Sequence, residues 1–463
     1  MSKHAGAELA QGRVSASEVL GHTVANITPS AMAAFTVALV VADAGVHTWL
    51  VYALVGVFMG LVAFQVAAVT RLAPAAGSLF VSLSRVLHPL AGVLAGWCMI
   101  GGYLGALFAA PVLVGSFTHK VLLLWGLPSP PAWVLAAICA VVSWWLALRD
   151  VEIATRFGLI VEVVSIGAML AVGVFALVRH GWVDPRQLQL TGLHVQGLLT
   201  AGTLTVLAYG GFETAANLSR ETQDPARVAP RAMLWSVGLV GLFFVFMAYA
   251  VVAGFSDNTA ELGKTSGPLG VLAVRLHLPV LATLADLGMA TAAFSATVAT
   301  LNSIARLLFS MARHRLMPSV LGRIHPRFAT PAPALHLLGA ASLLFAVVSG
   351  LAVWPVLKII DLFGIFTSLG FLVIYLLALA ARPVYCRRHH LKVPWSAWIA
   401  LLLSGPMLGR VLWANIYPVP PFPKDWVTVA FAAYLLLGVI VYRRWARGRP
   451  ERVEQLITGI AGD

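Results

Sequence analysis

Long apolar runs separated by short polar segments dominate the chain from residue 19 to residue 442. A helix needs about 20 mostly apolar residues to cross the hydrocarbon core of a bilayer. The sequence therefore predicts an all-α polytopic membrane protein with twelve transmembrane helices. These helices are expected at 19–42, 47–70, 91–118, 131–148, 153–178, 197–218, 233–255, 280–309, 332–352, 355–381, 393–414 and 426–442.

Composition agrees with this pattern and excludes a soluble protein. Hydrophobic residues make up 60% of the 463 residues and charged residues only 11%, whereas soluble proteins carry about 25% charged residues. In the predicted topology most of the 31 Lys and Arg lie in loops on the side of both termini, and such loops are normally cytoplasmic. We therefore expect a multi-pass protein of the cytoplasmic (inner) membrane with both termini in the cytoplasm. The net charge of +13 then reflects topology and contact with membrane lipid, and no nucleic-acid partner is expected.

Two of the twelve spans contain residues that interrupt a helix. Pro29 lies inside the first span and disfavours helical backbone at Thr28, so the helix should unwind near Ile27 to Ser30. The sixth span contains Gly210 and Gly211, which are poor helix formers. Irregular backbone in the membrane is tolerated only beside protein or a watery cavity, so both interruptions predict a binding site.

The two interruptions are five spans apart, so the second five spans enter the membrane from the opposite side. This spacing predicts an inverted repeat, the arrangement in which paired broken helices form a transporter's binding site. The expected segments are an N-terminal cytoplasmic segment 1–18, a first repeat 19–178, a second repeat 197–381, two further helices within 393–442 and a basic cytoplasmic tail 443–463.

Several motifs are similar to those of the amino acid-polyamine-organocation (APC) superfamily. They are Tyr209–Glu213 with Glu221–Pro230, Pro74–Phe80 with Gly96–Trp97, and Leu301–Arg306 with Ala312–Pro318. The resemblance implies a leucine-transporter-type fold, with a 5+5 inverted repeat and two peripheral helices, and secondary transport of amino acids or related amines. The chain departs from the family pattern in the first span, where Thr28-Pro29-Ser30 replaces a Gly-Ser-Gly type break.

The predicted substrate site follows from the two interruptions. Backbone and hydroxyl groups at the first break suit a carboxylate or polar end of a substrate. Carbonyl groups at the second break suit an amine, which Glu213 could also contact, and nearby aromatic side chains could close over the ligand. The predicted substrate-binding residues are Ile27, Thr28, Ser30, Ala31, Tyr103, Tyr209, Gly210, Gly211, Phe212, Glu213 and Phe294.

The coupling ion is left open between H⁺ and Na⁺, and no other cofactor is expected. Carboxylates within a span are functional candidates for proton coupling, namely Glu213 and Glu162. Glu162 could equally be a structural residue that bridges to Arg156 or to another helix. In the family's fold Na⁺ binds between spans 1 and 8, and some proton-coupled relatives place a lysine there from span 5. Ser165 stands near that position, and Ser295 and Thr297 could supply oxygen ligands.

The leading hypothesis is a secondary active transporter that moves an amino acid or related amine across the cytoplasmic membrane by alternating access. One alternative is a permease or exchanger of polyamines or organic amines. Another is a transporter-like sensor that binds a ligand without translocating it. An enzyme is not expected, because the chain has no phosphate-binding loop and no nucleophile elbow. The oligomeric state and the exact substrate are not determined by the sequence.

Overall fold

The computed structural model describes residues 15–447 apart from 73–78, 150–151, 223, 225, 266 and 329, and also residue 451. Within these residues every regular element is a helix, which confirms the all-α prediction. Most of the predicted N-terminal segment 1–18 and of the basic tail 443–463 lie outside the described residues.

The helices follow the predicted spans closely. The first half of the chain forms α1 (Ala16–Ile27), α2 (Pro29–Ala44), η1 (Gly45–His47), α3 (Thr48–Leu72), α4 (Leu79–Val86), α5 (Pro89–Leu124), α6 (Ala132–Arg149) and α7 (Glu152–His180). After the short α8 (Pro185–Leu188) come α9 (Val195–Tyr209), η3 (Phe212–Glu221), α10 (Val228–Gly254), α11 (Thr259–Leu262), α12 (Pro268–Arg275) and α13 (Pro279–Arg313). The last elements are η4 (Ser319–Gly322), α14 (Ala332–Leu351), α15 (Val356–Arg388), α16 (Trp395–Ala414) and α17 (Lys424–Ala446).

In the described part of the chain, ten helical segments are long and apolar enough to cross a membrane. The first of these segments, Ala16–Leu72, contains two of the predicted spans, because α2, η1 and α3 follow one another without an intervening loop. The sixth predicted span does not qualify, because the interruption leaves α9 only 15 residues long. If the first segment is counted as two spans and the broken sixth span is added to the ten, every predicted span of this multi-pass membrane protein is accounted for.

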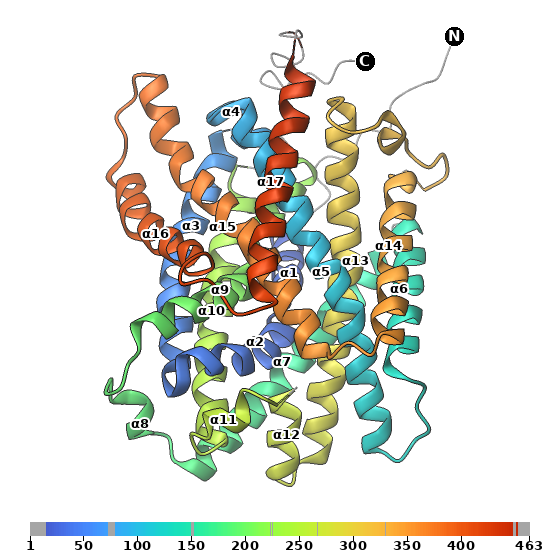
Figure 1. Ribbon diagram of the computed structural model, residues 1–463, viewed down its shortest axis with the longest axis vertical. Coiled ribbons are helices and arrows are strands. Elements are labelled where there is room, and N and C mark those ends of the chain that lie inside the picture. The colour runs from blue at the N-terminus through green and yellow to red at the C-terminus, as the bar shows by residue number, and fades with distance from the viewer. Residues whose placement is uncertain are drawn as a thin grey trace.

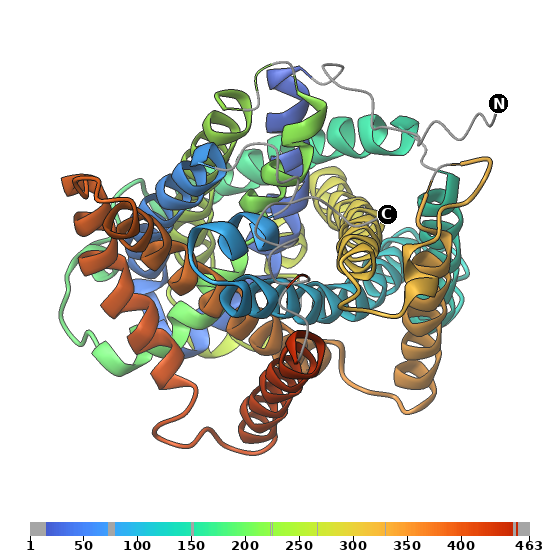
Figure 2. The same cartoon turned by 90° about the horizontal axis from the view of Figure 1, so that it is seen from above.

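The longest helices form the centre of the bundle. α5 has 36 residues and α13 has 35, and the two pack against each other. α10 packs on α3, and α15 packs on α5. Both views place α6 beside α14 at one edge and α16 at the other, with α17 on the outside (Figures 1 and 2). The interrupted spans, formed by α1 with α2 and by α9 with η3, lie inside this frame.

Candidate functional site

The first interruption is confined to one residue. α1 ends at Ile27, α2 begins at Pro29, and Thr28 between them adopts left-handed backbone with φ 51°. This conformation costs an L-residue about 1–2 kcal/mol. Local hydrogen bonds offset part of the cost, because the Thr28 hydroxyl donates to the carbonyl of Ile27 at 2.8 Å and its N–H donates to Val24 at 3.1 Å. The predicted unwinding near Ile27 to Ser30 is therefore confirmed and is shorter than expected.

A carboxylate from a distant helix caps the restarted helix. Oε1 of Glu162, on α7, accepts from the Ser30 N–H at 3.0 Å, and Oε2 accepts from the Ser30 hydroxyl at 2.7 Å. Ser30 is the second residue of α2, where N–H groups lack partners within the helix. Glu162 thus satisfies one of these donors and neutralises the positive end of the α2 dipole. The sequence leaves Glu162 either as a proton carrier or as a structural residue that bridges to another group. The structure shows such a bridge, from Glu162 on α7 to Ser30 on α2.

The second interruption touches the first. α9 ends at Tyr209, Gly210 is extended and Gly211 has φ 110°, before the chain continues as the 3₁₀ helix η3. A Cβ at Gly211 would lie 2.8 Å from the carbonyl oxygen of Asn26 and 3.1 Å from the nitrogen of Ile27. Glycine is therefore required at this position both by backbone conformation and by the close approach of the two broken spans.

Glu213 joins the second interruption to two other helices. Its fully buried carboxylate accepts hydrogen bonds from the hydroxyl of Tyr103 at 2.9 Å, from the hydroxyl of Tyr375 at 3.1 Å and from the N–H of Gly211 at 3.1 Å. Tyr103 belongs to α5 and Tyr375 to α15. The ring of Phe371 lies between these tyrosines, with centroids 5.7 Å from Tyr103 and 5.8 Å from Tyr375. Glu213 therefore holds an aromatic cluster in place behind the break.

A cavity opens where the two interruptions meet. Its lining is mostly apolar and includes small residues of α5 and α13 such as Ala106, Ala109 and Ala293, which leave room for a ligand. The lining residues with polar side chains are Asn26, Thr28, Thr36, Tyr103, Thr300 and Thr367. Among the described residues that line the cavity, none is Lys, Arg, His, Asp or Glu. The cavity suits a small molecule with a substantial apolar part and few polar groups.

The predicted substrate-binding residues divide into two groups. Those that line the cavity are Ile27, Thr28, Ala31, Tyr103, Gly210 and Gly211. The others are not among the lining residues: Ser30 donates to Glu162, Tyr209 donates to the carbonyl of Tyr52 at 2.8 Å, and Phe212 stacks on Tyr375 with centroids 5.4 Å apart. Glu213 lies behind Tyr103, and Phe294 is partly buried on α13, next to the cavity-lining Ala293.

The remaining coupling candidates lie on α7 and α13. Among the described residues, the buried hydroxyl of Ser165 has no hydrogen-bond partner. It packs directly against Gly288, where any larger side chain would clash with it. The hydroxyl of Thr297 donates to the carbonyl of Ala293 at 2.8 Å, the usual internal bond of a threonine in a helix. Ser295 is partly buried on the same helix.

Sequence reasoning missed several residues of the site. Phe371, Phe363 and Thr367 of α15 line the cavity, as do Asn26 and Thr36 of the first span. Thr36 lies four residues after the cavity-lining Met32, on the same face of α2. The α15 residues carry no local signal, since they belong to an ordinary apolar span.

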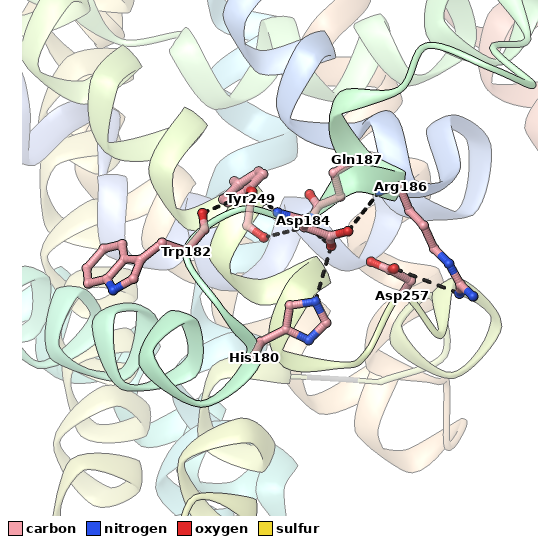
Figure 3. Close-up of polar contacts among 7 residues, drawn as sticks. All are labelled: His180, Trp182, Asp184, Arg186, Gln187, Tyr249 and Asp257. Carbon is pink, nitrogen blue, oxygen red and sulfur yellow. Dashed lines mark hydrogen bonds and ion pairs between the residues drawn. The ribbon is translucent and has the colours of Figure 1, made fainter.

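A separate polar cluster lies in the loops at the end of the bundle that carries α8 and α11 (Figures 1 and 3). Asp184 accepts hydrogen bonds from the side chain of Gln187 at 2.9 Å and from the Arg186 N–H at 3.0 Å. Burial opposes ionisation of Asp184, but these hydrogen bonds outweigh it and lower its pKa. Burial and the neighbouring carboxyl of Asp184 raise the pKa of Asp257 to about 6. We therefore expect Asp257 to change its protonation state at a higher pH than an ordinary aspartate.

Fold and site together define a multi-pass helical membrane protein with a small-molecule cavity between two interrupted spans. The profile of the amino acid permease family matches residues 16–441. The chain belongs to this family, which is part of the APC superfamily, and the predicted resemblance is thereby confirmed.

Three relatives illustrate the range of the family. An uncharacterized transporter of Mycobacterium tuberculosis is 30% identical over 316 residues, which cover 66% of this chain. The matched part also covers 66% of that relative, just under two thirds of its length. The low-affinity putrescine importer PlaP of Escherichia coli is 26% identical over 65% of this chain and 67% of the importer. The large neutral amino acids transporter small subunit 2 of Homo sapiens is 26% identical over 67% of this chain and 56% of that protein.

Proposed function

We propose that this protein is a secondary active transporter that moves an amino acid or related amine across the cytoplasmic membrane by alternating access. The observation that carries the proposal is the cavity at the meeting point of two interrupted spans, lined by Thr28 and Gly211. Paired broken helices at one site are the typical binding arrangement of secondary transporters. Membership of the permease family and the transporter relatives support the same function.

The cavity favours a neutral amino acid or a small monoamine as substrate. A polyamine has a charged group at each end, and a site for it should present carboxylates toward both ends. The described cavity lining offers none, and the buried Glu213 contacts this lining through hydrogen bonds from the hydroxyl of Tyr103 and the N–H of Gly211. The similarity to a putrescine importer keeps a polyamine permease as the second candidate.

The direction and coupling of transport form part of the same proposal. We place both termini in the cytoplasm, because basic side chains such as Arg387, Arg388, Arg443 and Arg444 follow the apolar parts of α15 and α17. A gradient of H⁺ or Na⁺ drives uptake. Glu162 and Glu213 are the candidate proton carriers, and Ser165, Ser295 and Thr297 are the candidate Na⁺ ligands.

Uptake into proteoliposomes tests the proposal. Purified protein is reconstituted, a pH gradient or a Na⁺ gradient is imposed, and uptake of labelled amino acids, monoamines and putrescine is measured. We expect saturable, gradient-dependent uptake of at least one neutral amino acid or monoamine. Binding without uptake would instead identify a sensor, and the absence of both for every compound, with correct insertion shown, would refute the proposed function.

A further inference from the structure

The cap on α2 uses a donor that a substrate carboxylate would also need. The positive end of a helix dipole and its unpaired N–H groups are a favourable environment for a carboxylate. At the start of α2, Pro29 has no N–H, and the Ser30 N–H is bonded to Glu162. The Met32 N–H donates to the carbonyl of Thr28. In the described structure this leaves the N–H of Ala31 as the first-turn donor without a partner, and Ala31 lines the cavity.

The cavity offers no other cationic feature to a carboxylate. Among its described lining residues there is no Lys, Arg or His, so the start of α2 is its most electropositive part. A substrate with a carboxylate would therefore place it beside Ala31. Ser30, the residue just before Ala31, already holds the carboxylate of Glu162. Two ionised carboxylates at one buried helix end repel each other strongly.

In the described part of the chain, no basic side chain is paired with Glu162. Both hydrogen bonds that it makes to described residues end on Ser30, and its side chain is only 3% exposed. α7 packs against α1, α2, α10, α12 and α13, and none of the titratable groups on their described residues forms an ion pair or hydrogen bond with Glu162. The main groups of this kind are His22, Asp43, Arg231, Arg275, Asp286 and Arg306.

We propose that Glu162 is a specificity-determining positioning residue whose protonation decides whether the cavity accepts a carboxylate. With Glu162 ionised, its carboxylate occupies the positive end of α2, and an amino acid binds poorly. When one proton is bound to a Glu162 oxygen, this helix end is free of negative charge, and the amino acid carboxylate binds beside Ala31. The proton and the substrate then travel together, and both leave on the other side of the membrane. This inference rests on the proposed function and adds a rule for its substrates.

The proposal separates amino acids from the amines that lack their carboxyl group. Leucine and isopentylamine differ by that group alone, and both keep their charges between about pH 5 and 7.5. We expect leucine to bind at least about tenfold more tightly at about pH 5 than at pH 7.5, since a like charge is removed from a buried site. Isopentylamine should not gain affinity on acidification. Ornithine and putrescine provide a second matched pair.

Binding to the purified full-length protein is measured by calorimetry for all four compounds. Glu162→Gln should bind leucine with the same affinity at both pH values, whereas Glu162→Asp, which still titrates, should keep a pH dependence. Glu261→Gln is the matched control, because Glu261 lies in the loop element α11 and pairs with Arg275. It should retain the wild-type pH dependence.

The outcomes are distinguishable. Leucine affinity that does not change with pH in the wild-type protein overturns the inference, and this measurement needs no variant to fold. A pH dependence that persists in Glu162→Gln also overturns it, because another group then carries the proton. Leucine and ornithine that fail to bind at any pH, while the amines bind, would overturn it as well. If none of the four compounds binds and no uptake of any substrate is found, the proposed function itself fails.

Discussion

The two interrupted spans make the same kind of break by opposite means. In the first, a β-branched residue, Thr28, is held in left-handed backbone, and the cap comes from Glu162, 132 positions from its partner Ser30. In the second, Gly211 adopts positive φ without strain, and Glu213 caps its N–H from two positions away. The second break is thus built into its local sequence, whereas the first depends on a contact from another helix.

This contrast predicts that the two breaks respond differently to substitution. A change at the second break should act directly on the backbone, because glycine itself supplies the geometry. A change at the first should relieve strain or remove a tertiary contact.

The largest effect is expected for Gly211→Ala. The new Cβ would be strained by the positive φ and would lie within 3.1 Å of backbone atoms of Asn26 and Ile27, which cannot rotate away. We expect a destabilisation of more than about 2 kcal/mol and the loss of most transport, measured by thermal unfolding in detergent and by uptake. Gly238→Ala, on an exposed part of α10 with open space around it, is the control and should leave uptake unchanged. Wild-type uptake by Gly211→Ala would show that the contact between the breaks is dispensable.

A smaller loss is expected for Glu213→Gln. The amide nitrogen of Gln cannot accept a hydrogen bond, so a buried hydroxyl of Tyr103 or Tyr375 loses its acceptor. The expected destabilisation is about 1–3 kcal/mol. Combining the change with Tyr375→Phe should cost less than the sum of the single changes, because the two residues share one interaction. Strict additivity in this thermal-unfolding cycle would contradict the bond that links the second break to α15.

At the first break, Thr28→Gly should stabilise the protein, whereas the two changes at the second break destabilise it. Glycine removes the strain of left-handed backbone but gives up the hydroxyl bond to Ile27, so we expect a stabilisation between zero and about 1 kcal/mol. Thr28→Val keeps the branched side chain without the hydroxyl and should destabilise the protein by about 1 kcal/mol. Thermal unfolding of both variants is the measurement. A clear loss of stability in Thr28→Gly would mean that the break is not strained.

The smallest effect concerns the loop cluster of Figure 3, which must be separated from any pH effect at the breaks. The pKa of Asp257 is raised to about 6, so the folded protein binds this proton more tightly than the unfolded chain. The resulting stability is present below the unfolded value near 4 and is lost as the pH rises to about 6. The pKa of Asp184 is lowered, so its ionised form stabilises the folded protein. This stabilisation is lost only when the pH falls through the lowered pKa, at more acidic pH.

We therefore expect the melting temperature of the wild-type protein to fall slightly as the pH rises from about 4 to 6. Asp257→Asn should flatten this slope without changing the pH dependence of leucine binding. Should the variant instead alter leucine binding, the loop cluster and the cavity would be coupled.

Local chemistry explains which parts of the site could be predicted. Pro29 and the pair Gly210 and Gly211 disrupt a helix wherever they occur in it, so both breaks were located without any tertiary information. Glu213 was linked to its break because it follows within one turn. By contrast, nothing local to Ser30 and Tyr209 indicates the partners of their side chains, which in the structure are Glu162 and the carbonyl of Tyr52. Near a break the helical phase changes, so the facing of a side chain cannot be projected across it.

The sequence by itself determined the membrane-spanning helices, the positions of the two breaks and the scarcity of buried charge. These properties depend on the hydrophobicity and backbone preference of each segment. Only the tertiary structure decided that the breaks touch at Gly211 and Asn26, that Tyr375 shares the carboxylate of Glu213, and that Glu162 caps α2. Those contacts join residues far apart along the chain, and helix packing, which no single segment encodes, brings them together.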